Sequence, residues 1–189
     1  MQKKWLENHE LFYSELLNGI KYQKIVKQKI NELGITVHSA NLEGKWDPDG
    51  KEDQFKKWTE ERKELKKVRK EFAEKDEDIL IGKGKLLCEC KSRNLEFKNA
   101  ASFPYPDIFI DTVSGYEKKE VKPAYTFCIS QKTNAVIYIE TSPENKSKWI
   151  KKFIYDKKRG IKELNYSAPK ELWKDLKHFK EEFLKKHNE

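Results

Sequence analysis

Cysteine is scarce in this chain: only Cys88, Cys90 and Cys128 stand among its 189 residues. An odd count without a Cys-x-x-Cys pair argues against a disulfide framework or a zinc ribbon, and is typical of a reducing compartment. Long apolar runs are also lacking, since none approaches the roughly 18 residues of a transmembrane helix. The amino-terminal Met-Gln-Lys-Lys-Trp has no apolar block such as a signal peptide carries. We therefore expect a soluble, cytoplasmic protein with no membrane partner.

Positive charge, by contrast, is abundant. Lysine and arginine number 40 against 32 aspartates and glutamates, which gives a net charge of +8. Aromatic residues make up 12% of the chain, and because disordered chains are poor in aromatics we expect a folded protein with a heavily charged surface. The basic excess suits a polyanionic partner such as DNA. No internal repeat or low-complexity linker divides the sequence, so residues 1–189 are predicted to form one domain.

The chemistry of the chain concentrates in residues 76–93, which predict a strand, a tight turn and a second strand. Side chains alternate between the two faces of a strand. Glu89 and Lys91 therefore share one face of the second strand, while Cys88 and Cys90 lie on the other. Holding a glutamate and a lysine on a mostly apolar strand costs free energy. We therefore expect this pair to have a function.

The length of the turn decides whether Asp78 joins this pair. With a two-residue loop at 83–84 or a four-residue loop at 82–85, antiparallel pairing puts Asp78 opposite Glu89, with Cβ atoms about 5 Å apart. A three-residue loop would put it opposite Cys88, on the wrong face. Two carboxylates at that distance repel unless a proton or a cation lies between them. Oxygen ligands with open positions suit Mg²⁺ or Mn²⁺ rather than zinc.

Asp78, followed after ten residues by Glu89-Cys90-Lys91, resembles the core of the PD-(D/E)xK nuclease superfamily. That superfamily includes restriction enzymes, archaeal-type junction resolvases and RecB-type exonucleases. The resemblance implies a restriction-endonuclease-like αβα sandwich with a central mixed β-sheet. It also implies a Mg²⁺ site, in which Mn²⁺ substitutes, held by Asp78, Glu89 and the backbone carbonyl of Cys90. Lys91 would orient or help to deprotonate the attacking water.

Residues 19–34 predict a helix that ends at a glycine, with a short strand at 35–38, and the core stripe is formed by Tyr22, Val26, Ile30 and Leu33. This helix resembles the opening helix of the superfamily, which often carries a glutamate that helps to hold the metal. Gln23 stands at the matching position, where a neutral amide could bind a metal-bound water or simply face solvent. Glu15, on a preceding helix over residues 3–18, could substitute if the chain bends at Gly19.

Several further elements are expected. Residues 51–75 predict a charged helix, inserted between the first strand and the hairpin if the resemblance holds. A strand at 108–110 precedes a charged loop at 111–122, and strands at 124–130 and 135–140 flank a hairpin turn. Pro106-Asp107 spells the "PD" of the superfamily but follows the Glu-x-Lys strand, so it is rejected as the catalytic aspartate.

The carboxyl-terminal third predicts two helices. The first spans 144–159, and the second begins with Ser167 as its cap and Pro169 in its first turn. The second helix carries an apolar stripe that either packs in the core or forms the seam of a homodimer, and the stripe consists of Leu172, Leu176, Phe179 and Phe183.

Two groups of residues are predicted to contact nucleic acid. Ser92 and Arg93 extend the strand beyond Lys91, where they could touch a phosphate. The second group is the basic cluster of Lys157, Lys158 and Arg159. These cations could equally stabilise the carboxyl end of a helix.

The sequence therefore predicts a Mg²⁺-dependent deoxyribonuclease with Asp78, Glu89 and Lys91 as its catalytic residues. The alternative is a non-catalytic nucleic-acid-binding module, in which Glu89 and Lys91 form a structural ion pair. A structural or assembly protein with a helical dimer seam is a third interpretation. The shape of the DNA substrate stays open.

Overall fold

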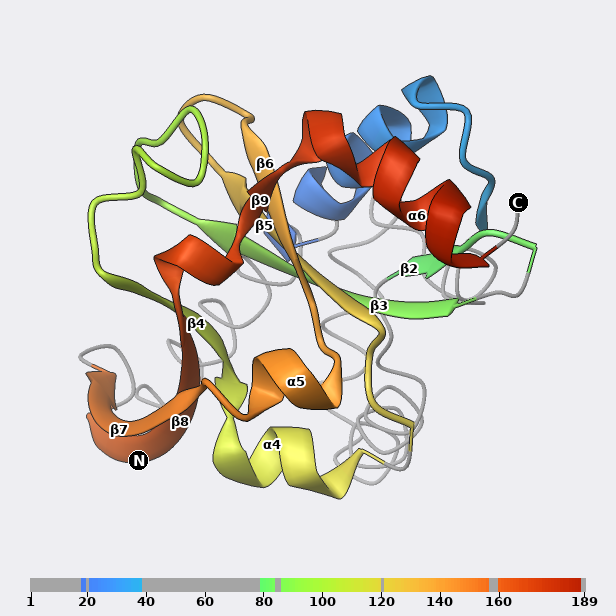
Figure 1. Ribbon diagram of the computed structural model, residues 1–189. Coiled ribbons are helices and arrows are strands. Elements are labelled where there is room, and N and C mark those ends of the chain that lie inside the picture. Colours follow the sequence, from blue (N-terminus) through green and yellow to red (C-terminus); the bar gives the residue numbers. More distant parts are fainter. Residues whose placement is uncertain are drawn as a thin grey trace, which may run out of the picture.

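Among the residues that the structure describes, a central β-sheet of six strands organises the fold (Figure 1). The computed structural model describes residues 18–19, 21–38, 79–83, 86–119, 121–156 and 160–187. The expected helix over 51–75 lies outside these residues, and so does nearly all of the one over 3–18. None of the helices in the described ranges is long and apolar enough to cross a membrane.

The larger sheet is mixed, because β3 and β5 run parallel while the other neighbouring pairs run antiparallel. Its strands, in spatial order, are β1 (Val37–His38), β2 (Ile79–Ile81), β3 (Leu86–Arg93), β5 (Tyr125–Ser130), β6 (Val136–Glu140) and β9 (Lys174–Asp175). The predicted β5–β6 hairpin is confirmed, with Asn134 in the turn at a positive φ of 55°. A mixed α/β fold is thereby confirmed.

The predicted helix before β1 is confirmed over residues 21–32. Its stripe reaches the core because Tyr22, Val26 and Ile30 are buried. Gly34 ends the helix at φ 82°, and its N–H donates to the carbonyl of Asn31 at 2.8 Å. The N–H of Ile35 reaches back to the carbonyl of Ile30. These two bonds satisfy carbonyls that the end of a helix would otherwise leave open.

One face of the larger sheet is covered by helices. Helix 21–32 and α6 (Phe179–His187) pack on the face that carries Cys88, Phe127 and Tyr138 (Figure 1). Phe179 and Phe183 of α6 are fully buried in this cluster. Core packing of the terminal stripe is therefore confirmed for these two residues, which leaves neither of them available to a dimer seam.

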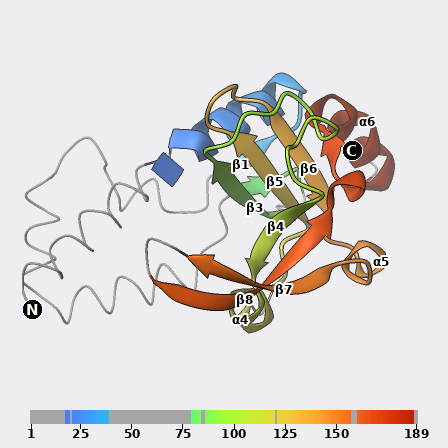
Figure 2. The same cartoon turned by 90° about the vertical axis from the view of Figure 1, so that its left-hand side faces the viewer.

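The other face is covered mainly by strands. A loop at 94–106 leads to β4 (Asp107–Thr112), which lies in a three-stranded sheet with β8 (Ile161–Pro169) and β7 (Ile150–Asp156). The short helices α4 (Val113–Lys118) and α5 (Pro143–Lys146) complete this layer (Figures 1 and 2). Within the described residues, this layer therefore differs from the helical one that an αβα sandwich would have.

The prediction of a helix over 144–159 is wrong. Among the described residues of this range only α5, at 143–146, is helical, and Ile150 begins a strand that pairs antiparallel with β8. Trp149, Phe153 and Ile154 can be placed on one side of a helix, but β-branched and aromatic residues favour a strand once a partner strand is present. Gly160, at φ 68°, belongs to the connection between β7 and β8 rather than to a helix end.

The predicted start of the last helix is also wrong. Ser167 and Pro169 lie in β8, opposite Phe109 and Asp107 of β4. The chain then makes two short 3₁₀ turns, η1 (Lys170–Leu172) and η2 (Leu176–His178), on either side of β9, and α6 begins only at Phe179. Polar cap residues occur in strands as well, so a Ser-x-Pro pattern does not fix a helix start without its neighbours.

The predicted loop over 111–122 is wrong in its first half. Asp111 and Thr112 complete β4, and Val113 begins the one-and-a-half turns of α4. The three cysteines, all within the described residues, are not joined by disulfide bonds.

Candidate functional site

The β2–β3 hairpin has the register that the sequence predicted. Four residues, 82–85, connect the strands, and Gly82 adopts a positive φ of 71°. The paired residues are Ile79 with Cys88, Leu80 with Leu87, and Ile81 with Leu86. In this register, position 78 was predicted to follow as the partner of Glu89. Asp78 itself lies outside the described residues.

Glu89 and Lys91 share a face of β3, as predicted, and it is the face covered by β4 and α4. Glu89 is 7% exposed. In the parallel pairing with β5, Glu89 lies beside Thr126 and Lys91 beside Cys128, so each pair shares a face of the sheet. Cys88 and Cys90 point to the other face, where they pack with the helical layer.

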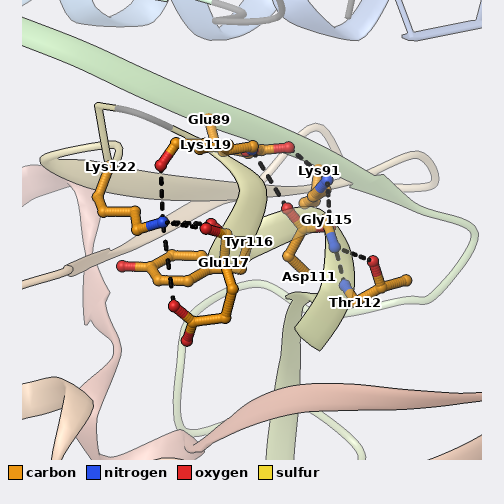
Figure 3. A network of polar contacts seen from close by, with 9 residues as sticks. All are labelled: Glu89, Lys91, Asp111, Thr112, Gly115, Tyr116, Glu117, Lys119 and Lys122. Carbon is orange, nitrogen blue, oxygen red and sulfur yellow. Dashed lines mark hydrogen bonds and ion pairs between the residues drawn. The ribbon is translucent and has the colours of Figure 1, made fainter.

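Four charged side chains meet at this place (Figure 3). Glu89 is ion-paired with both Lys91 and Lys119. Lys119 Nζ lies 3.2 Å from Asp111 Oδ2, and Lys91 Nζ lies 3.8 Å from Asp111 Oδ1. Two carboxylates and two ammonium groups thus alternate in a compact network, in which the Lys119 ammonium bridges Glu89 and Asp111.

The end of β4 and the start of α4 hold Asp111 in place. Thr112 caps α4, because its Oγ1 accepts a hydrogen bond from the N–H of Gly115 at 2.9 Å. The N–H of Thr112 in turn donates to Asp111 Oδ1 at 2.8 Å. A Cβ atom on Gly115 would lie 2.6 Å from Thr112 Oγ1 and 3.4 Å from Asp111 Oδ1. This position therefore accepts glycine and little else.

Lys119 follows α4 directly, and a third lysine fixes this part of the chain. The ammonium of Lys122 donates hydrogen bonds to the backbone carbonyls of Tyr116 and Lys119, each at 2.7 Å (Figure 3). These two bonds fix the carboxyl end of α4. This cap places the Lys119 side chain over β3.

Asp111 and Lys119 are the members of the Glu89 network that sequence reasoning missed. Both fell in the stretch predicted as a charged loop. Thr112, as a helix cap after a strand, was the available signal for α4. No spacing in the sequence, however, linked either residue to Glu89, because the contact depends on how β4 crosses β3.

The two lysines keep Glu89 ionised. Burial alone would raise the pKa of its carboxyl group, but the positive charges of Lys91 and Lys119 and the hydrogen bonds from both hold that pKa below its ordinary value. For Lys119, burial opposes the charged form, but Glu89 and Asp111 outweigh it and raise the pKa of the ammonium. Glu89 and Lys119 are therefore both charged at neutral pH.

The oxygen atoms of Glu89 and Asp111 converge on one cation position, which the Lys119 ammonium takes. Carboxylate oxygens are the ligands that Mg²⁺ and Mn²⁺ prefer. A neighbouring hydroxyl is also unsatisfied: Thr126 Oγ1 is fully buried and has no hydrogen-bond partner among the described residues. These donors fit a hard divalent cation. The described residues alone contain no group of three or more His, Cys, Asp or Glu side chains that could hold a metal.

The other predicted metal-site residues are placed as follows. The N–H of Ala124, just before β5, donates to the carbonyl of Leu87 at 2.7 Å. Because successive carbonyls of a strand alternate in direction, the carbonyl of Cys90 points to the β2 side. Gln23 lies on the helix that covers the opposite face of the sheet from Glu89. Glu15 lies outside the described residues.

Two of the predicted nucleic-acid contacts, Ser92 and Arg93, lie among the described residues. Ser92 Oγ accepts a hydrogen bond from Gln131 Nε2 at 3.1 Å. The guanidinium of Arg93 stacks 4.6 Å from the ring centre of Phe109, and burial lowers its pKa. A phosphate contact by Arg93 would require this packing to open, and it stays a prediction. The basic cluster at 157–159 lies outside the described residues.

Comparison of the chain with protein-family models, with curated proteins and with solved structures gives no match.

Proposed function

We propose that this protein is a metal-dependent deoxyribonuclease that hydrolyses DNA phosphodiester bonds at the Glu89–Lys91 face of β3. The observation that carries the proposal is the convergence of Glu89 and Asp111 on one cation position, with the Lys91 ammonium 3.8 Å from Asp111. Asp78 is proposed as a third acid, since the described hairpin register supports its predicted pairing with position 89.

A restriction-endonuclease-like fold is part of the proposal. The mixed sheet, the Glu-x-Lys strand in its interior and the helical layer on one face support it. The strand-rich layer on the other face is a departure from that fold. This layer supplies Asp111, and it therefore takes part in the site rather than merely covering it.

Glu89, Asp78 and the carbonyl of Cys90 would hold Mg²⁺, or Mn²⁺ in its place, together with Asp111. The metal, when bound, would polarise the scissile phosphate and acidify a bound water. Ionised Glu89 supplies negative charge to the cation position at neutral pH. Lys119 must release at least one of its two carboxylates when that position is filled.

Lys91 would act on the attacking water. Its ammonium is held beside both carboxylates. From there it can orient the water, help to remove its proton, and offset the charge that develops on the phosphorane. The basic excess of the chain would bind the DNA backbone without reading bases, so affinity should fall steeply with salt.

A second function has a specific observation in its favour. Glu89 is already neutralised by Lys91 and Lys119, as it would be if the network were purely structural. A non-catalytic nucleic-acid-binding module would use such a network to fix β4 and α4 on the sheet, and would bind DNA through the same basic surface.

Plasmid and branched-junction DNA, incubated with and without Mg²⁺, separate the two functions. The nuclease predicts metal-dependent cleavage that Lys91→Ala and Asp78→Asn abolish, while salt-sensitive DNA binding in EDTA survives. Binding without cleavage, in Mg²⁺ and in Mn²⁺, would support the binding module. Cleavage that neither substitution affects would contradict the proposed site.

A further inference from the structure

The β7–β8 hairpin carries a row of exposed apolar side chains. Figure 2 shows the end of this hairpin extending beyond β4, away from the larger sheet. β7 is the edge strand of the smaller sheet as the structure describes it. Phe153 is 62% exposed and Tyr155 is 59% exposed. Large rings this accessible on a projecting hairpin lie where a partner can reach them.

The two faces of the hairpin differ in charge. The register places Tyr155 opposite Lys162 and Lys151 opposite Tyr166, so these side chains lie on one face together with Phe153. Lys151 and Lys162 are exposed, and among the described residues of this face none is acidic. The opposite face carries Glu163, and its Lys152 is ion-paired with Asp107.

Cations are held close to the rings of this face. Lys162 Nζ lies 5.2 Å from the ring centre of Phe153, and Lys151 Nζ lies 5.4 Å from that of Tyr166. Residues two apart on a strand are separated by roughly 6.5 Å, so Phe153 and Tyr155 present two rings in succession. Exposed rings flanked by lysines match a chain of bases joined by phosphates.

We propose that the Phe153–Tyr155 face of the β7–β8 hairpin binds single-stranded nucleic acid, with bases stacked on the two rings and phosphates on Lys151 and Lys162. Duplex DNA hides the faces of its bases, so it would meet only the lysines. A second copy of this chain is a poorer occupant, because two faces bearing lysines repel. The inference goes beyond the proposed hydrolysis and does not depend on it.

The face also leads toward the Glu89 network. Tyr166, at the inner end of the face, donates a hydrogen bond to Glu117 of α4 at 2.6 Å, and Lys119 follows two residues later. The rings of Tyr166 and Tyr116 lie 5.6 Å apart. A single-stranded nucleic acid bound on the hairpin would thus be guided toward β3.

Binding in EDTA tests the inference without any cleavage. Fluorescence anisotropy of a labelled oligothymidine of about 20 nucleotides is compared with that of a duplex of equal length at the same salt. We expect the native chain to prefer the single strand. Phe153→Ala combined with Tyr155→Ala should weaken single-strand binding about tenfold or more and duplex binding far less. Phe153→Trp, which keeps a stacking ring, should retain affinity.

Ile154→Ala, on the opposite face of the same strand, is the matched control and should leave affinity unchanged, with circular dichroism verifying that all variants fold. Equal affinity for both DNA forms, or single-strand binding that survives loss of both rings, would overturn the inference. The inference would also be overturned if the variant without the two rings still bound oligothymidine but no longer bound anionic vesicles or no longer dimerised. Cleavage by the native chain would in that case still support the proposed nuclease.

Discussion

Lys119 Nζ lies 3.2 Å from Asp111 Oδ2, although the two residues stand at opposite ends of α4. The short helix reverses the connection between β3 and β5. The side chains of Asp111 and Lys119, which flank this helix, therefore meet beside Glu89 (Figure 3). The lysine takes the position between two carboxylates at which the proposed function requires a divalent cation.

Removing the bridging cation should expose the repulsion between the carboxylates. Loss of one partner from a largely buried ion pair costs about 3 kcal/mol or more. We therefore expect Lys119→Met to lower the free energy of unfolding in EDTA by about that amount, as measured by urea denaturation. Mg²⁺ should then stabilise the variant more than it stabilises the native protein, because a cation that binds only the folded state adds stability.

Lys148→Met is the matched control, because Lys148 pairs with Glu144 at an exposed site and such pairs contribute little. A variant at Lys119 that is as stable as native, and indifferent to Mg²⁺, would contradict the shared cation position.

The low pKa of Glu89 should appear in the pH dependence of stability. A carboxyl group with a depressed folded-state pKa contributes stability that is complete above its ordinary pKa of about 4.3 and is lost as the pH falls through the folded-state value. The difference in free energy of unfolding between native and Glu89→Gln should therefore shrink from pH 6 to about pH 3. Urea denaturation across this range measures it, and a difference independent of pH would contradict the account.

Gly115 should not tolerate a side chain. Its Cβ would lie 2.6 Å from Thr112 Oγ1, so Gly115→Ala must displace the cap of α4. Losing such a cap costs about 1 kcal/mol. Gly19 is the matched control, because it is helical and its Cβ would meet nothing within 4 Å among the described residues. We expect Gly19→Ala to leave the free energy of unfolding unchanged or to raise it. If Gly115→Ala and Gly19→Ala changed the free energy of unfolding equally, the predicted clash with Thr112 Oγ1 would be contradicted.

We expect the buried hydroxyl of Thr126 to contribute to activity but not to the stability of the fold. It has no hydrogen-bond partner among the described residues, so Thr126→Val should leave stability unchanged or raise it by about 1 kcal/mol in EDTA. Metal-dependent cleavage should nevertheless fall, since Thr126 pairs with Glu89 in the sheet and shares its face. By contrast, Ser130→Ala should destabilise the fold, because Ser130 Oγ donates to the carbonyl of Leu95 at 2.6 Å. A Thr126→Val protein with native cleavage would exclude this role.

The parts of the fold that could be predicted from the sequence are local. The register of Ile79 with Cys88 follows from the turn, and the end of helix 21–32 follows from Gly34. The β7–β8 hairpin could not be predicted, because the apolar spacing around Phe153 fits a helix as well as a strand until β8 is known as its partner. Local pattern decides such a case only when one period is clearly excluded.

The candidate site, too, could be predicted from the sequence only in its local part. Glu89 and Lys91 lie two apart on one strand, so their shared face follows from alternation alone. Asp111 reaches them only because β4 pairs with β8 and carries its end across β3. Contacts of this kind depend on packing between two sheets, which no short-range pattern encodes.

The rate of DNA cleavage at saturating enzyme, with Mg²⁺ present, tests the central claim most directly. It is measured for the native chain, for Glu89→Gln, and for Glu144→Gln, which removes an exposed carboxylate of α5 that pairs with Lys148. The account predicts that Glu89→Gln slows cleavage about 100-fold or more while Glu144→Gln cleaves at the native rate. Cleavage by Glu89→Gln at the native rate would contradict it.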